Sequence, residues 1–372
     1  MIRRGLTDPE RRNWLRLART ENVGPVTFDQ LIRRYGDPGA ALAALPELSR
    51  RGGRAQPPAI PSLARIDAEL AAGERLGARL ICACEPDFPP LLAGVDPPPP
   101  LIWARGVTAL LQRPGVAVVG ARIASAAGQR FARDLARHLG EAGYSVVSGM
   151  ARGIDAAAHD GAMAAGTVAV LGGGVDDIYP PEHADLYARL AIQGCVVSES
   201  PPGAKAQARD FPRRNRLISG LSLAVVVVEA ELRSGSLITA RLAGEQGREV
   251  LAVPGSPLDP RSKGTNDLIR QGAAICEGVD DVLRAIAGMS PLREPDHSAY
   301  PGPQADLYDP DASGDALRER LAALASPTPV SRDDLARLAG APAALVYAAL
   351  TELALAGRIA LLPGGSVVSG ET

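Results

Sequence analysis

A short basic segment with one aromatic ring, KAQARDFPRRNRLISG at residues 205–220, is the part of the sequence best suited to bind a polyanion. Its cations stand against the single acid Asp210, with Phe211 among them; they are Lys205, Arg209, Arg213, Arg214 and Arg216. Arginine and lysine bind phosphate oxygens, and an unpaired base can stack on an aromatic ring for about 1–3 kcal/mol. The segment therefore predicts binding of a single strand, although a solvated charged loop with Phe211 in the core would have the same composition.

A second set of candidate residues lies in short loops rich in glycine, serine and arginine. The loops are GARIAS, SGMARGID and RSGSLITA, and the candidates in them are Gly120, Arg122, Ser125, Gly149, Arg152, Gly153, Ser234, Gly235 and Ser236. A glycine lets the backbone approach a phosphate, a guanidinium holds phosphate oxygens in a fork, and hydroxyls with backbone N–H groups cradle an anion. Each loop alone could equally be a tight strand-to-helix turn, but several such loops together favour anion binding.

The usual signatures of nucleotide-dependent enzymes and of metal sites are missing from the sequence. No segment matches GxxxxGK[ST], and the GGG run at residues 172–174 is not a GxGxxG fingerprint. The histidines have no carboxylate partners at metal-ligand spacing; they are His138, His159, His183 and His297. The sequence thus predicts no metal, no other cofactor and no catalytic residue.

Short runs rich in valine and isoleucine alternate with helical segments between residues 113 and 287. The runs are GVAVVGA, YSVVSGM, TVAVLGGG, CVVSES, LAVVVVEA, EVLAVPG and AAICEG. They are apolar on both faces, as buried parallel strands are, and most end in glycine or serine before a helix. The pattern predicts an α/β fold with an extended Rossmann-like parallel sheet, and further edge strands in residues 80–105. Because ligands bind at the carboxyl ends of such strands, the sheet would bring the candidate loops together.

Two smaller domains flank the predicted sheet. Residues 1–55 have a helical pattern typical of a helix-hairpin-helix or SAM-like unit, with Gly24 in a turn before an amphipathic helix. Residues 56–287 form the Rossmann-like domain, and residues 288–314, rich in Pro, Asp, Ser and Gly, form a flexible linker. The pattern in residues 315–372 predicts three helices followed by a hairpin that turns at Gly364 and Gly365. This arrangement resembles a winged helix. Ser331 and Asp334 are spaced to cap the second of these helices.

The bulk composition limits how and where the protein acts. The formal net charge is −2, so a polyanion must be bound by a local basic patch. The cysteines form no CxxC pair and predict reduced thiols; they are Cys82, Cys84, Cys195 and Cys276. No apolar stretch is long enough to span a membrane, and the first residues have no secretory pattern. These features predict a soluble cytoplasmic protein.

The run from about residue 88 to residue 283 resembles the DNA-processing protein A family, also called DprA or Smf. The similarity rests on segments in the family's order, among them VAVVGARIAS, SGMARGIDAAAHDGAM, TVAVLGGGVDDIYPPEH, DFPRRNRLISGLS and KGTNDLIRQGA. It implies a non-enzymatic protein that binds and protects incoming single-stranded DNA during natural transformation, displaces single-strand-binding protein and loads RecA for homologous recombination. It also implies a homodimer formed by extended Rossmann-like domains.

The resemblance also implies roles for the candidate residues. Arg122 would contact a phosphate in a pocket that residues 149–153 line as well. The anion cradle would be completed by residues 234–236, and the backbone and base of the strand would be held by Phe211, Arg214 and Asn215. Ala127 stands where many relatives have a tyrosine before a glycine, so no aromatic contact is expected from that position.

Two other functions stay open from the sequence. Glu229 at a strand end could imitate the catalytic carboxylate of lysine-decarboxylase-like nucleotide hydrolases. The PGGxGT loop of those enzymes is, however, replaced by RSGSLIT. The winged-helix-like domain could instead bind duplex DNA as a regulator, through its third helix. That helix, ALVYAALTELALAG, has no basic residue until Arg358.

Overall fold

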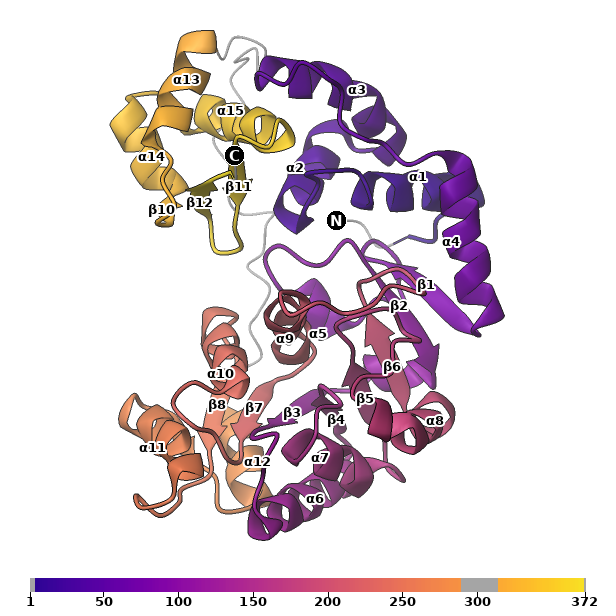
Figure 1. The fold of residues 1–372 in the computed structure, drawn as a ribbon, viewed down its shortest axis with the longest axis vertical. Coiled ribbons are helices and arrows are strands. Elements are labelled where there is room, and N and C mark those ends of the chain that lie inside the picture. Colours follow the sequence, from indigo (N-terminus) through magenta and orange to yellow (C-terminus); the bar gives the residue numbers. More distant parts are fainter. Residues whose placement is uncertain (1–3, 289–313, 371–372) are drawn as a thin grey trace. The chain divides into compact units, whose positions relative to one another are not determined.

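The computed structural model describes residues 4–288 and 314–370, and its chain divides into two compact units (Figure 1). The first unit comprises residues 1–5, 68–95 and 101–291, and the second comprises residues 6–67, 96–100 and 292–372, so far as these are described. The division falls within helix α4 (Leu63–Arg75). The predicted linker at residues 288–314 lies outside the described residues apart from its two ends.

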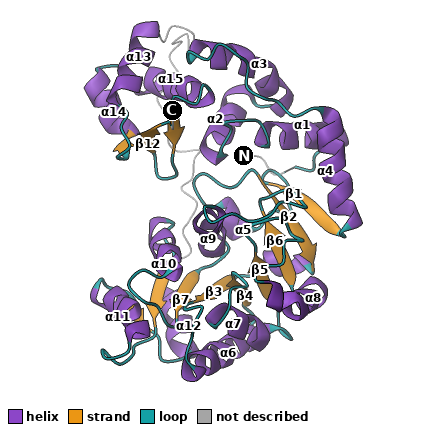
Figure 2. Ribbon diagram, in the orientation of Figure 1, coloured by secondary structure: helices purple, strands orange, loops and turns teal. Residues whose placement is uncertain are grey.

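The first unit is built on a nine-stranded sheet in the order β1-β2-β6-β5-β4-β3-β7-β8-β9. The strands are β1 (Ala78–Cys82), β2 (Leu101–Gly106), β3 (Gly115–Val119), β4 (Ser145–Ser148), β5 (Thr167–Val170), β6 (Cys195–Ser198), β7 (Ala224–Val227), β8 (Glu249–Ala252) and β9 (Ala274–Ile275). β2 pairs antiparallel with β1 and β6, and every other pairing in this sheet is parallel. The predicted parallel sheet with added edge strands is confirmed (Figure 2).

Helices cover both faces of this sheet. On one face, α5 (Pro90–Ala93), α9 (Asp210–Gly220) and α10 (Gly235–Glu245) share an apolar cluster with Ala117 and Val119 of β3. On the other face, α6 (Ala126–Glu141), α7 (Ile154–Ala162) and α12 (Val279–Gly288) share a cluster with Val116 and Val118. Successive strand residues point to opposite faces, so a strand covered on both sides is apolar throughout. The unit also contains α8 (Ala184–Gln193), α11 (Lys263–Arg270) and the 3₁₀ helices η1 (Thr108–Gln112), η2 (Pro181–His183) and η3 (Pro260–Ser262).

The second unit holds the two smaller domains. The N-terminal one consists of α1 (Asp8–Ala18), α2 (Pro25–Tyr35) and α3 (Pro38–Arg51). The C-terminal one consists of α13 (Asp315–Leu324), β10 (Val330–Ser331), α14 (Arg332–Ala339), α15 (Ala343–Leu355), β11 (Ile359–Leu361) and β12 (Ser366–Ser369). Gly364 and Gly365 form the hairpin turn with φ angles of 80° and 78°, and the Ser331 hydroxyl accepts the N–H of Asp334 at 3.0 Å. The predicted winged helix and its helix cap are thus confirmed.

Two general features of the chain bear on its chemistry. All four cysteines are buried. Across residues 4–288 and 314–370, no single helix is long and apolar enough to cross a bilayer; only α14 and α15 taken together reach that length and composition, and they are bent by 112°.

Candidate nucleic-acid interface

The strand order opens a crevice between β3 and β7 at the carboxyl edge of the sheet. From β3 the chain continues to β4, β5 and β6 on one side, while β7, β8 and β9 lie on the other. The loops after β3 and β7 therefore lead away from each other, and ligands of open α/β sheets bind in such a crevice. A groove of about 630 Å³ lies here, lined by residues 119–123 of the first loop, residues 233–236 of the second and the start of α9.

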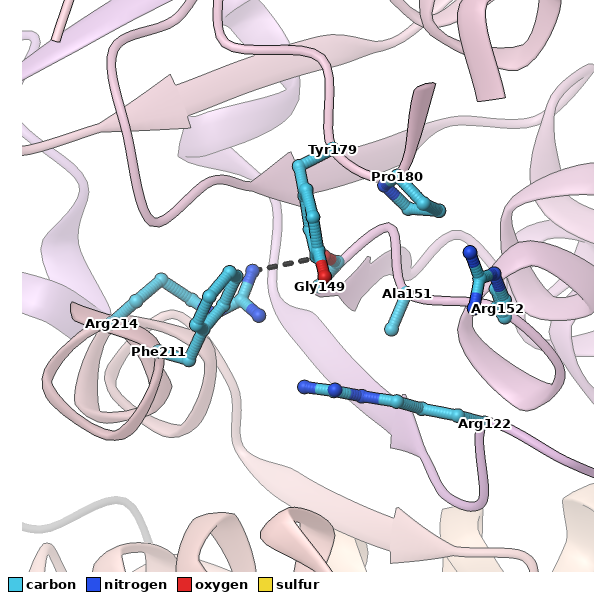
Figure 3. A pocket seen from close by; sticks show the side chains of 8 residues that line it. All are labelled: Arg122, Gly149, Ala151, Arg152, Tyr179, Pro180, Phe211 and Arg214. Carbon is cyan, nitrogen blue, oxygen red and sulfur yellow. Dashed lines mark hydrogen bonds between the residues drawn. The ribbon is translucent and has the colours of Figure 1, made fainter. Parts of the chain in front are cut away.

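Phe211, in the first turn of α9, lines this groove. The guanidinium carbon of Arg122 lies 5.8 Å from the centroid of its ring, and that of Arg214 lies 6.0 Å away. The ring of Tyr179, which is 51% exposed, lies 5.4 Å from it, centroid to centroid. Figure 3 shows these four side chains around one small pocket of about 30 Å³ beside the groove. The half-buried Phe211 ring thus offers a stacking surface next to two groups that bind phosphate.

The two arginines beside this ring differ in how far their charges are already satisfied. Arg122 is exposed and pairs with no carboxylate of the described residues. Arg214 is buried; its Nη1 donates to the carbonyl oxygens of Gly149, at 2.9 Å, and of Val170, and its Nε donates to Oδ1 of Asn215 at 3.3 Å. Burial lowers the pKa of Arg214 to about 10. Its Nη2 has no hydrogen bond to the described part of the chain, so this nitrogen can still donate to a phosphate oxygen.

The loop after β4, residues 149–153, is held in an unusual backbone conformation. Met150 has a φ of 56°, and Gly153 has a φ of 72°. The buried carboxylate of Asp155 accepts hydrogen bonds from the N–H groups of Gly149, at 3.1 Å, and Ala151, at 3.3 Å. A left-handed conformation at a non-glycine residue costs about 1–3 kcal/mol and persists where the surroundings enforce it. The loop is therefore a fixed wall of the pocket.

Replacing Gly153 with alanine is expected to displace this wall and the Arg122 loop beside it. A Cβ atom at position 153 would lie 2.3 Å from the carbonyl oxygen of Ala121 and 2.8 Å from that of Arg122. We expect Gly153→Ala to lower the free energy of unfolding by about 2 kcal/mol, measured by urea denaturation. Gly143 is the matched control, because its φ is 91° but a Cβ there meets nothing within 4 Å. Equal losses for Gly153→Ala and Gly143→Ala would contradict a role for the close approach.

The start of α10 forms another side of the groove. Ser234 caps this helix: its hydroxyl accepts the N–H of Ser236 at 3.3 Å, and the two hydroxyl oxygens are 2.7 Å apart. Gly235 is exposed, and its carbonyl accepts Nδ2 of Asn215 at 3.2 Å. Thr239, one turn further on, is 2% exposed and lines the groove as well. Hydroxyls and N–H groups at a helix start favour a bound anion, so this side of the groove can take a phosphate.

Most of the candidate residues named from the sequence line the groove or the small pocket. These are Gly120, Arg122, Gly149, Arg152, Phe211, Arg214, Asn215, Ser234, Gly235 and Ser236. The others, Ser125, Gly153, Lys205 and Arg213, are absent from both linings. Gly153 nevertheless shapes the pocket wall, and Arg213 is exposed in the first turn of α9.

Three of the candidates already have acidic partners inside the protein. Nζ of Lys205 lies 3.0 Å from Oδ1 of Asp177, and Arg152 pairs with Glu182. Ser125 donates both its N–H and its hydroxyl to the carboxylate of Glu229. The hydroxyl of Ser125 is therefore a structural group in this state, and the cations of Lys205 and Arg152 are partly neutralised.

Tyr179, Arg233 and Thr239 are among the lining residues that were not identified from the sequence. Tyr179 stands in GGGVDDIYP, which the sequence places at a strand end, and aromatic residues make up only 3% of the chain. An aromatic residue in such a loop is therefore a usable signal. Thr239 follows Ser236 by three positions on one helix face, and that spacing could have indicated it. Arg233 directly precedes a candidate serine but carries no distinguishing pattern of its own.

This geometry defines a class: a Rossmann-like α/β protein whose switch-point crevice is lined by arginines, hydroxyls and aromatic rings instead of a dinucleotide fingerprint. Residues 79–287 match the family DNA recombination-mediator protein A. Residues 8–72 match the DprA-like N-terminal HHH domain, and residues 304–365 match the DprA winged helix domain. The chain belongs to the DNA-processing protein A family, DprA or Smf, whose members are DNA-binding mediators of recombination.

Several relatives match most of the chain. Protein Smf of Escherichia coli K12 is 42% identical over 309 residues, 81% of this chain and 80% of that protein. The putative DNA processing protein DprA of Mycobacterium tuberculosis H37Rv is 36% identical over 372 residues, 95% of this chain and 92% of that protein. The crystal structure of DprA from Streptococcus pneumoniae aligns with a TM-score of 0.62 and 29% identity, covering 76% of this chain and 98% of that one. The DNA processing protein A of Helicobacter pylori, solved to describe its single-stranded DNA binding mode, aligns with a TM-score of 0.51 and 28% identity, covering 57% and 96%.

Proposed function

We propose that this chain binds single-stranded DNA in the groove between β3 and β7, protects it, and loads RecA onto it during natural transformation and homologous recombination. The observation that carries the proposal is the Phe211 ring with the guanidinium groups of Arg122 and Arg214 within 6.0 Å of its centroid. A single strand supplies both partners of this arrangement, a free base face and a nearby phosphate, whereas a duplex hides its base faces. The single-stranded DNA binding mode described for the Helicobacter pylori relative supports the same ligand.

In this proposal the polar residues that would touch the strand have different roles. Arg122 and Arg213 are exposed and would bind phosphates directly, and Arg214 would add its Nη2. Residues 234–236 would take a further phosphate at the start of α10. Lys205 and Arg152 would contribute by exchanging a carboxylate partner for a phosphate.

The remaining candidates would shape the groove and leave the strand untouched. The glycines at 120, 149 and 153 let loops approach where a Cβ atom would meet other atoms at 2.9 Å or less. Asn215 connects Arg214 to the start of α10, because it accepts from one and donates to the other. Ser125 would fix the end of the Arg122 loop.

Arg122→Ala tests the proposed strand contact. We expect it to weaken binding of an oligo-dT of about 20 nucleotides about tenfold at low salt, because it removes a phosphate contact. The slope of log K against log salt should flatten by about 0.7, the contribution of one phosphate on a single strand. Fluorescence anisotropy at several salt concentrations measures both. Arg130→Ala, an exposed arginine of α6 outside the groove, is the matched control. Equal or tighter binding of a matched duplex by the unmodified protein would overturn the proposal.

The partners in this proposal are RecA, single-strand-binding protein and a second copy of the chain in a homodimer, all within the cytoplasm. Membership of a family of recombination mediators supports them. RecA filament formation on DNA coated with single-strand-binding protein tests the loading step. An unchanged rate of filament formation when this protein is added would remove that step from the proposal while leaving strand binding intact.

The competing functions lose support from specific contacts. A nucleotide hydrolase would need the Glu229 carboxylate free to act on substrate, but both of its oxygens accept hydrogen bonds from Ser125. A duplex-binding regulator would need basic residues on the third helix of the winged helix, and α15 has none. We therefore propose a binding protein with no catalytic activity of its own.

A further inference from the structure

Glu229, two residues beyond the end of β7, connects the two loops that border the crevice. Its Oε2 accepts the N–H of Ser125 at 2.9 Å, and its Oε1 accepts the Ser125 hydroxyl at 2.5 Å. The same hydroxyl accepts the N–H of Gly128 at 2.9 Å. A Cβ atom on Gly128 would lie 2.6 Å from both Cδ and Oε1 of Glu229, so only glycine allows the carboxylate to lie this close to the helix. The carboxylate thus rests against the first turn of α6.

The position that this carboxylate occupies is the one where Rossmann-like folds bind phosphate. In such folds, the helix after the first strand of the switch point presents free N–H groups and the positive end of its dipole to the ligand. α6 is that helix here; it follows β3 and is 16 residues long. A negative charge from the protein itself satisfies the helix start, so a phosphate arriving there would meet both a filled position and a like charge.

We propose that Glu229 is a specificity-determining residue that acts as a built-in anion at the start of α6 and excludes free nucleotides from the crevice. Because the start of α6 is occupied, the groups that remain to bind phosphate are Arg122, Arg214 and the start of α10. Both arginines lie beside the Phe211 ring, and the start of α10 lines the same groove. A mononucleotide brings a single phosphate and can engage only part of this set, whereas a strand brings several linked phosphates that can engage it together. The ligand class is therefore polynucleotide, and this inference rests on the proposed function for the identity of the strand.

The contact between Glu229 and Ser125 has a second consequence for the site. Ser125 ends the loop that carries Arg122, and it caps α6 at the same time. Because Glu229 accepts both the N–H and the hydroxyl of Ser125, the end of this loop is fixed relative to β7. Loss of the carboxylate should therefore loosen Arg122 and weaken strand binding while it opens the helix start to small anions.

The test compares binding of thymidine monophosphate and of oligo-dT by the full chain and its variants. We expect Glu229→Ala to bind the mononucleotide about tenfold more tightly than the unmodified protein, because it vacates the helix start. Glu229→Gln keeps the shape and removes the charge, and should gain about threefold. Glu141→Ala is the matched control: it removes an exposed carboxylate at the other end of α6, which neither lines the groove nor takes part in the contact with Ser125. It should change mononucleotide affinity by less than about twofold.

The outcomes separate this inference from the proposed function. If oligo-dT binds the unmodified protein and neither Glu229 variant gains mononucleotide affinity over Glu141→Ala, the inference is overturned and the proposed function stands. If the unmodified protein fails to bind oligo-dT, the proposed function falls, whatever the variants do with the mononucleotide. Thermal unfolding of each variant identifies a folding failure, and if Glu229→Ala does not fold, Glu229→Gln decides the question alone.

Discussion

Arg214→Leu is expected to lower the free energy of unfolding by about 4 kcal/mol. The substitution leaves the carboxylate of Asp155, which is 6% exposed, without the cation that faces it. It also removes the donor for the carbonyl oxygens of Gly149 and Val170. Removing a cation that faces a buried carboxylate costs more than removing both charges, since the remaining charge stays desolvated. Urea denaturation of the variant measures the loss.

The double variant Arg214→Leu with Asp155→Asn is the control for this explanation. If the unpaired charge causes most of the loss, the double variant should recover about 1–3 kcal/mol relative to the sum of the two single losses. Strictly additive losses would show that Asp155 and Arg214 do not interact, and the large effect would then come from lost packing and from the lost hydrogen bonds to Gly149 and Val170.

The loss of stability caused by Arg214→Leu should depend on pH, and the burial of Asp155 determines in which direction. Burial raises the pKa of Asp155, and the charge of Arg214 offsets part of that rise in the unmodified protein. Without Arg214 the carboxyl pKa in the folded protein rises further above its unfolded value, so folding takes up a proton. Stability is then retained at low pH and lost as pH rises through the raised pKa. The loss caused by Arg214→Leu should therefore be larger at pH 8 than at pH 5.

The sheet could be predicted from the sequence because its strands are covered on both faces. In β3, Val116 and Val118 face one apolar cluster while Ala117 and Val119 face the other, so the run GVAVV contains no polar residue. The carboxyl ends of parallel strands lie at the same edge, so the sequence predicts the edge at which the candidate loops meet. The strand order, which places the crevice between β3 and β7, comes from the fold.

The sequence could not predict which of the cations are already paired with an acidic side chain of the protein. The composition of the basic segment at 205–220 includes Arg216 and Lys205 among the cations that could bind phosphate. In the structure Arg216 is buried against Glu199, and Lys205 pairs with Asp177. The partner of Lys205 is 28 residues earlier in the chain, so the pair exists only through the tertiary fold. Within the segment Arg209 and Arg213 stay exposed, and separate loops add the exposed cations Arg122 and Arg233. Local composition overestimates a binding patch wherever distant acids reach it.

Phe211→Ala is expected to weaken binding of oligo-dT about 5- to 150-fold, the equivalent of about 1–3 kcal/mol for a lost base stack. The ring carries no charge, so the slope of log K against log salt should stay unchanged, in contrast with Arg122→Ala. Phe211→Tyr keeps the stacking face and is the control, and it should bind within about twofold of the unmodified protein.

Comparing Phe211→Ala with Arg122→Ala distinguishes two roles of the ring, stacking on a base and support of the neighbouring arginines. Arg122 and Arg214 both lie against the Phe211 ring, so its loss could act by releasing their side chains. In that case Phe211→Ala would flatten the salt slope as the loss of a phosphate contact does, and an abasic oligonucleotide would bind the unmodified protein as tightly as oligo-dT. If instead a base stacks on the ring, the abasic strand should bind the unmodified protein about as weakly as oligo-dT binds Phe211→Ala, because each removes one partner of the same contact.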